Sequence, residues 1–226
     1  MKTQHQIDKL FLFAVVMLAL FLNPANLFAQ KEEQQNSYQT LFGNSSSHGG
    51  YGGVLMGHTK IGDNSAVLSG FKGGWIIGHS LTLGLAGNAF VTEFNSEKLP
   101  NNDFNIIAGG YGGLLLEPII YGMKPIHVSV PTIIGFGTVA FETGNFNQND
   151  QYPHDFDTFF MVESGLELEM NITNYFRIAV GGTYRFTSNV ELMYTDPDNE
   201  INSVHVLGKN DLNRQNFYMS FKFGKF

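Results

Sequence analysis

Large apolar residues alternate with small or polar residues along many segments of this chain, and the last segment shows the pattern most simply. In residues 217–223 every odd position holds phenylalanine or methionine, whereas the even positions hold Tyr218, Ser220 and Lys222. A period of two residues is typical of a β-strand with one face against apolar surroundings and the other against a wetter space. The alternation therefore predicts a strand in a wall that separates two environments.

Eight segments with strand character follow a polar N-terminal region. Each has ten or more residues, which is enough for a tilted strand to cross a bilayer core, whereas strands in soluble proteins have a usual length of about 5 to 6 residues. The pattern predicts an all-β fold, an eight-stranded antiparallel up-and-down transmembrane β-barrel. The predicted strands are 49–61, 66–78, 81–93, 103–117, 126–143, 156–170, 175–187 and 212–223.

The connectors between these segments alternate in length. Residues 78–80 and 171–174 are tight, whereas residues 94–102, 144–155 and 188–211 are long and rich in Asn and Asp. The first outward connector, residues 62–65, is the short exception. Membrane barrels of this kind have short periplasmic turns and longer outward loops. The alternation predicts a periplasmic N-terminus and three substantial outward loops.

Three prolines surround the fourth connector: Pro118, Pro125 and Pro131. Proline has no N–H to donate to a ladder, and a closed barrel has no edge strand to accommodate it. Two interpretations remain open: either Pro131 lies at a bulge, or the fifth strand starts at Thr132 and residues 117–131 form a folded periplasmic rim. We prefer the second.

Charged residues occupy one face of the sixth and seventh predicted strands. The tight turn between these strands places Glu167 or Glu169 opposite Arg177, and Glu163 nearer Thr183 and Arg185. Buried carboxylates need cationic partners, and an eight-stranded barrel is only wide enough for side chains to fill it. We therefore expect a structural charge network in the lumen rather than an ion path or an acid/base pair. Its predicted members are Glu163, Glu167, Glu169, Arg177 and Arg185.

The N-terminus predicts export. Residues 10–22 form an apolar run after Lys2 and Lys9, shorter than the roughly 20 residues of a membrane helix, and Ala29 ends a suitable cleavage site. We expect signal-peptide-dependent export and, with the strand pattern, a place in the cell outer membrane. The expected division is a cleaved signal peptide at 1–29, a flexible polar linker at 30–48 and the barrel at 49–226.

Composition narrows the chemistry further. The chain has no cysteine, which excludes disulfides, thiol chemistry and lipoprotein acylation. Its net charge of -7 becomes -8 without Lys2, Lys9 and Asp8, since 11 basic and 19 acidic side chains remain, so nucleic acid is not an expected partner.

The 26 glycines suit curved strands better than helices. Gly49–Gly53 lacks the Lys-Ser/Thr ending of a phosphate-binding loop.

No motif predicts catalysis. The histidines are scattered without metal-site spacing. His154-Asp155 with Ser188 or Ser203 could form a surface triad like that of a lipid-modifying barrel enzyme, and the acidic stretch 196–200 lacks the offsets of a calcium loop. We expect no catalytic, cofactor-binding or metal-ligating residue.

Several motifs together resemble the small outer-membrane β-barrel proteins of the OmpA/OmpX-like class, especially the glycine-rich barrels of Bacteroidota-type bacteria. The motifs are Tyr111–Glu117, His127–Pro131, Gly135–Gly137, Glu167–Asn171, Phe176-Arg177, Gly181–Arg185 and Phe217–Phe226. The resemblance implies folding by the barrel-assembly machinery, which reads an aromatic-rich last strand. The assembly-signal residues are then Phe217, Met219, Phe221, Phe223 and Phe226. Because Phe226 is out of phase with the others, we expect it to overhang the periplasmic rim.

The class has no common activity, so the expected function rests on analogy. We expect a non-enzymatic structural or surface-interaction role through loops 144–155 and 188–211. An outer-membrane lipid-modifying enzyme and a narrow channel are the alternatives. The expected partners are outer-membrane lipids, the assembly machinery and an extracellular ligand. The expected contact residues in the loops are Phe146, Tyr152, Tyr194 and Val204–Val206.

Overall fold

The computed structural model describes residues 48–94, 104–144, 155–196 and 199–226. The expected signal peptide, nearly all of the linker and the tips of the three long loops lie outside these residues. Within the described ranges no helix is long and apolar enough to cross a membrane. The strands are β1 (His48–Ile61), β2 (Asn64–Ile77), β3 (Leu81–Glu93), β4 (Phe104–Ile120), β5 (Ile126–Ser129), β6 (Thr132–Gly144), β7 (Asp155–Thr173), β8 (Phe176–Thr187), β9 (Leu192–Asp196), β10 (Asn199–Leu207) and β11 (Gln215–Lys225).

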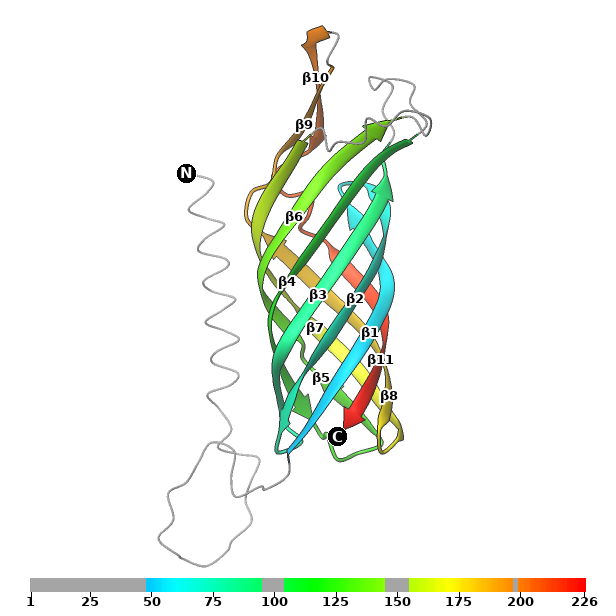
Figure 1. Cartoon of the computed structure of the whole chain (residues 1–226). Coiled ribbons are helices and arrows are strands. Elements are labelled where there is room, and N and C mark those ends of the chain that lie inside the picture. The colour runs from blue at the N-terminus through cyan, green and yellow to red at the C-terminus, as the bar shows by residue number, and fades with distance from the viewer. Residues whose placement is uncertain (1–47, 95–103, 145–154, 197–198) are drawn as a thin grey trace, which may run out of the picture. The chain divides into compact units, whose positions relative to one another are not determined.

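The wall is a closed ring of antiparallel strands (Figure 1). Around the ring the order is β1, β2, β3, β4, β6, β7, β8 and β11, and β11 pairs again with β1. The ring follows the chain order throughout. This confirms the predicted eight-stranded up-and-down barrel, with strand bounds within a few residues of those expected.

The two ends of the barrel differ in their connectors. We call the end with the β2–β3 and β7–β8 turns the turn end, and the opposite end, with the long connectors, the loop end. At the turn end Gly78 and His79 both have positive φ, 59° and 54°, the geometry of a type I′ hairpin turn, whose twist matches that of the flanking strands. The first and last residues of the wall also lie at the turn end, as expected for an even number of strands that starts at the end with the short turns.

Pro131 lies in a short break between β5 and β6. A strand starts at Thr132, as the preferred interpretation expects, but the bulge of the first interpretation and the folded rim of the second are both wrong. The short β5 and the longer β6 are two parts of one strand between β4 and β7, since β4 keeps the same register with both of them, and so does β7. The backbone oxygen of Pro131 still accepts a hydrogen bond from the N–H of Gly165 at 3.3 Å. The ladder therefore continues from β5 to β6 without a change of register, and Pro131 removes only its own N–H from it.

The wall is apolar outside and polar inside, the reverse of a soluble protein. The large apolar side chains exposed on the outer face include Val54, Met56, Phe71, Leu85, Leu114, Phe136, Leu166, Phe217 and Phe223. The buried polar side chains on the lumen face include Lys72, Asn88, Glu117, Glu163, Glu167, Glu169, Arg177, Arg185, Asn216 and Lys222. An outer surface of this kind is unfavourable in water and favourable against lipid.

Several lumen aromatics lie across a glycine on the neighbouring strand. Phe159 pairs with Gly137, and Tyr218 pairs with Gly181. A Cβ atom added to Gly181 would lie 2.8 Å from the Tyr218 ring, and one added to Gly137 would overlap the Phe159 ring. These glycines provide the space in which the rings lie against the wall, which accounts for part of the high glycine content.

We predict that Gly137→Val destabilises the barrel, because the new side chain would displace Phe159 in a filled lumen. Overpacking of this kind costs about 1–3 kcal/mol. The matched control is Gly52→Val on the outer face, where an added Cβ meets nothing within 4 Å. Urea unfolding of both variants in lipid vesicles measures the difference, and equal midpoints would contradict this role of Gly137.

Candidate functional site

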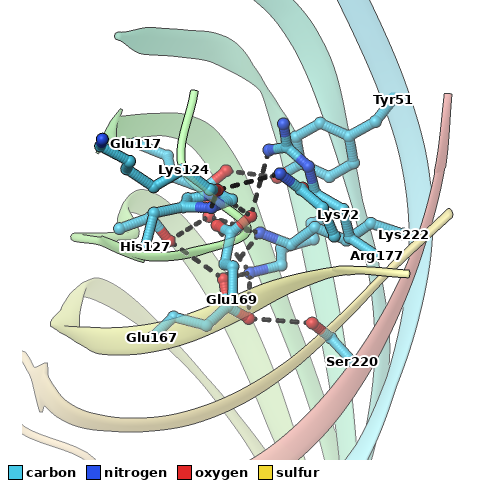
Figure 2. A network of polar contacts seen from close by, with 12 residues as sticks. Tyr51, Lys72, Glu117, Lys124, His127, Glu167, Glu169, Arg177, Ser220 and Lys222 are labelled. Carbon is cyan, nitrogen blue, oxygen red and sulfur yellow. Dashed lines mark hydrogen bonds and ion pairs between the residues drawn. The ribbon is translucent and has the colours of Figure 1, made fainter. Parts of the chain in front are cut away.

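A group of charged side chains fills the turn-end half of the lumen (Figure 2). All of them are buried, and they come from strands distributed around the ring. We call this group the turn-end cluster. Its members are Lys72 on β2, Glu117 on β4, His127 on β5, Glu167 and Glu169 on β7, Arg177 on β8 and Lys222 on β11.

Glu167 lies at the centre of the turn-end cluster. Its carboxylate accepts hydrogen bonds from the Lys72 ammonium group at 2.6 and 2.8 Å and from the Lys222 ammonium group at 2.7 Å. The hydroxyls of Ser220 and Ser129 donate to the same carboxylate at 2.9 and 3.3 Å. This carboxylate therefore has the charged and neutral donors that a fully buried anion needs.

Lys222 connects the three carboxylates. Its Nζ lies 3.0 Å from Glu117 Oε1, 2.7 Å from Glu167 Oε2 and 2.8 Å from Glu169 Oε1. The second oxygen of Glu117 accepts a hydrogen bond from the Tyr51 hydroxyl. One ammonium group thus donates its three protons to three carboxylates, one on β4 and two on β7, and cross-links β11 to both strands inside the barrel.

The charges of the turn-end cluster balance without a metal ion. Oxygens of Glu117, Glu167 and Glu169 lie within 4.8 Å of one another, a spacing at which three carboxylates could hold a metal. Here the ammonium groups of Lys72 and Lys222 lie among these oxygens and supply the cations. Together with Arg177, they offset the three negative charges.

Glu169 has a different set of partners on its second oxygen. Arg177 Nη1 lies 3.3 Å from Glu169 Oε2, and the Nε2 atom of His127 lies 3.1 Å from it. The other ring nitrogen of His127 lies 3.2 Å from the backbone oxygen of Lys124. Of the two carboxylates expected opposite Arg177, the structure places Glu169 in contact with it, whereas Glu167 lies with the lysines.

Phe226 covers the turn end of the lumen instead of overhanging the rim. Its ring lies 3.8 Å from the guanidinium carbon of Arg177 and 6.2 Å, between centroids, from the Tyr51 ring. Phe217, Met219 and Phe223 are exposed on the outer face, and Phe221 is half-buried there. The terminal aromatic is therefore a cap over the turn-end cluster, and the sequence-based expectation for Phe226 is wrong.

Glu163 and Arg185 lie nearer the loop end and are register partners in the wall, so the expected proximity of Glu163 to Arg185 and Thr183 is confirmed. Glu163 and Arg185 form no ion pair with each other, however, contrary to the expected charge network. Glu163 accepts a hydrogen bond from the Thr183 hydroxyl at 2.7 Å. The guanidinium group of Arg185 lies against the rings of Phe90 and Tyr111, 5.1 and 4.9 Å from their centroids. Its Nε donates to the backbone oxygen of Leu212 at 2.9 Å, so a cation–π arrangement takes the place of the expected salt bridge.

The lumen retains little free volume beside Glu163. A cavity lined by Lys72, Asn88, Glu163, Thr183 and Tyr218, among others, leaves about 10 Å³ for the centres of water molecules. That is about the space of one water. Beside Glu163, side chains therefore fill the lumen almost completely.

The long connector 188–214 closes the loop end, which the sequence did not predict. It contains the hairpin β9–β10, which extends beyond the wall in Figure 1. The hairpin is fastened by the β7 residues Asp157 and Asp155, whose carboxylates accept hydrogen bonds from the N–H groups of Glu191 and Met193 at 3.1 and 2.8 Å. Its buried apolar side chains join the main core: Val190, Leu192, Tyr194, Val204, Val206 and Leu207.

This packing corrects the expected contact surface. Tyr194, Val204 and Val206 are buried in the barrel mouth, where Tyr194 meets the Phe141 ring edge-on at 5.8 Å. The exposed residues of the hairpin base are Glu191, Met193 and His205. Phe146 and Tyr152 lie outside the described residues.

The structure gives the candidate triad no support among its described members. Asp155 is engaged by the hairpin, and the Ser188 hydroxyl accepts a hydrogen bond from the N–H of Phe160 at 3.0 Å. His154 lies outside the described residues, and so does the side chain of Ser203. Of the acidic stretch 196–200, Asp196 and Asn199 are register partners in the hairpin, and residues 197 and 198 lie outside the described residues.

Sequence reasoning missed Lys72, Glu117, His127 and Lys222 as members of the charge network. Each occupies a lumen-facing position of its strand. The period-two alternation already turns Lys222 inward and could have placed Lys72 inside as well. What alternation cannot show is which lysine meets which glutamate across the lumen. That depends on the stagger of strands around the closed ring.

The closed wall, its apolar outside and its charged inside define a membrane-spanning β-barrel of the small outer-membrane type. No family model and no curated protein matches the chain. Among solved structures it is similar to Neisserial surface protein A, with 10% identity and a TM-score of 0.46 over 79% of this chain and 97% of that chain.

Two further solved structures are similar at a lower level. Ail, the attachment invasion locus protein of Yersinia pestis, has 11% identity and a TM-score of 0.38 over 78% of this chain and 97% of that chain. The outer membrane protease OmpT from Escherichia coli has 9% identity and a TM-score of 0.32 over 80% and 97%. The class assignment rests on the geometry of the wall, and no activity is carried over from these proteins.

Proposed function

We propose that this protein is a non-enzymatic integral protein of the outer membrane, whose closed barrel supports a surface-exposed hairpin for interaction with extracellular partners. The observation that carries the proposal is the closure of the lumen in both halves. The turn-end cluster fills one half, and the core that includes the hairpin base fills the other. The barrel then serves as a rigid anchor, and β9–β10 is the part offered to the outside.

The filled lumen argues against the channel alternative. Ion conduction needs a continuous wet path, whereas the lysines and glutamates here are bonded to one another with little space between them. Buried charges with mutual partners are more typical of a structural network than of a pathway. The engaged Asp155 carboxylate argues in the same way against the triad of a lipid-modifying enzyme.

Surface presentation is tested by an epitope inserted between Asp196 and Asn199, at the hairpin tip. We expect an antibody to label intact cells, because the loop end faces outward and the base of the hairpin is held by side chains away from the insertion. The matched control is the same epitope in the turn-end connector, after Gly122. Labelling of the tip only after permeabilisation would contradict the proposed orientation.

The closed lumen is tested separately in planar lipid bilayers. We expect purified protein to give no discrete conductance steps, because described side chains occupy the lumen in both halves. Discrete steps in the wild type that change in Glu167→Gln would instead support the narrow channel.

A further inference from the structure

A hollow on the outer face of the wall, near the loop end, gathers basic and aromatic side chains. Its volume is about 310 Å³, within the usual range of small-molecule sites. The hollow extends across three adjacent strands, β1, β11 and β8, and the short segment before β11. Its lining residues are His58, Lys60, Tyr184, Asn213, Arg214, Gln215 and Phe217.

The hollow lies where the apolar outer face gives way to polar residues. Along β1 the outward positions carry Val54 and Met56, both more than half exposed, and then His58 and Lys60. The register places Phe217 of β11 beside His58. Aromatic residues such as Phe217 and Tyr184 at this level are typical of the boundary between hydrocarbon and headgroups.

The hollow is lined by basic rather than acidic side chains. Three of its seven lining residues are basic and none is acidic, in a chain whose net charge is -7. Among the residues that the structure describes, neither His58 nor Lys60 forms an ion pair. The imidazole of His58 and the ammonium group of Lys60 are therefore available to bind a ligand.

Arg214 is fixed in position beside them. Its Nε donates to the backbone oxygen of Gly62 at 3.0 Å, and its Nη1 donates to those of Asn210 and Asn213 at 3.0 and 3.1 Å. Its Nη2 has a longer contact, 3.6 Å to Asp211. A guanidinium group held by backbone carbonyls loses little conformational entropy when an anion binds.

We propose that this hollow binds the phosphate-bearing headgroup of a lipid in the outward leaflet, with Lys60, His58 and Arg214 around the phosphate and Phe217 and Tyr184 against the upper acyl chains. The inference rests on the proposed membrane barrel and its orientation. A hollow that opens on the lipid face takes its ligand from the bilayer. Charge complementarity selects an anionic headgroup over a neutral one.

Native mass spectrometry of the purified protein in nonionic detergent tests the site. The probes are dioleoylphosphatidic acid and dioleoylglycerol, which share acyl chains and differ by the phosphate. We expect one phosphatidic acid to be retained and dioleoylglycerol not to be. The double variant His58→Gln/Lys60→Gln should bind phosphatidic acid at least about tenfold more weakly, since hydrogen bonds to charged groups contribute that much or more.

The matched control is Lys124→Gln, an exposed lysine at the turn end, which should bind like the wild type. Equal binding by the double variant, equal retention of dioleoylglycerol, or displacement of the lipid by inorganic phosphate at equal concentration would each overturn the proposal. Arg214 is left intact because it ties the start of β11 to the β1–β2 turn.

The heat-dependent gel shift of each variant reports folding of the barrel. If no form of the protein shows the shift, the membrane barrel itself is wrong. If the wild type and the double variant both show it and bind the lipid equally, only the headgroup site is wrong.

Discussion

Replacing Lys222 by methionine is expected to cost about 3–5 kcal/mol of barrel stability, the usual effect of removing one partner from a buried ion pair. Methionine keeps much of the side-chain volume, so the lost quantity is the charge. The three carboxylates that Lys222 contacts would then face only Lys72, Arg177 and His127. Urea unfolding in lipid vesicles, followed by the gel shift, measures the change.

Lys225→Met is the matched control. Lys225 lies three residues further along β11 and is exposed, so its replacement should change stability by less than about 0.5 kcal/mol. A second variant separates charge from packing: adding Glu117→Gln to Lys222→Met removes the unbalanced negative charge and should recover part of the loss. If the two losses simply add, the electrostatic account of the turn-end cluster fails.

Leu192→Ala is expected to release the hairpin from the barrel mouth while the wall stays closed. Leu192 is fully buried in the core cluster, and truncation of such a side chain costs about 2–5 kcal/mol. The loss falls on local docking of the hairpin, so the fraction with an open hairpin should rise at least about tenfold. Cleavage by proteinase K within residues 188–211 measures that fraction, and the gel shift shows that the barrel remains folded.

The neighbouring Met193→Ala serves as the control, because Met193 is 42% exposed and points away from the mouth. It should be cleaved at the wild-type rate. Equal cleavage of both variants would mean that the hairpin is not held by its apolar face. Loss of the gel shift in Leu192→Ala would mean that the hairpin and the wall unfold together.

The wall could be predicted from the sequence because its determinants are local. Alternation depends only on whether a side chain faces lipid or lumen, so it predicts that Phe217, Met219 and Phe223 share the apolar face, where all three are exposed. Pro131 shows the limit of local reasoning. A missing N–H is a real loss, but the register on both sides of β5 and β6 is kept by many other ladder bonds, and these outweigh it.

For the lumen, the sequence predicts that buried charges have oppositely charged partners, but it does not predict which residues pair. Inward-facing glutamates on β7 predict cationic partners, and the structure supplies Lys72 from β2, across the barrel. Arg185 was expected to bond Glu163 because they are neighbours, whereas it lies against Phe90 and Tyr111. Whether the guanidinium group of Arg185 meets a carboxylate or an aromatic face depends on the packing of side chains from the whole ring, which the pattern along one strand does not determine.

The hairpin residues show a related limit. The sequence predicts Tyr194 and Val204–Val206 as exposed contact residues, because these largely apolar residues lie in a polar loop. Tyr194, Val204 and Val206 are buried anchors. An apolar residue in a long connector has two explanations, a partner outside the protein or a place inside it, and composition does not separate them.

The position of Phe226 bears on how the wall is kept closed. The pairing of β1 with β11 is the seam that joins the first and last strands of the ring, and closing so long a segment of chain is entropically unfavourable. The Phe226 ring lies against Tyr51 on one side of the seam and Arg177 on the other, so Phe226 helps to hold the first and last strands of the ring together. A purification tag fused after Phe226 would begin beside these contacts, whereas a tag at the hairpin tip would leave the seam intact.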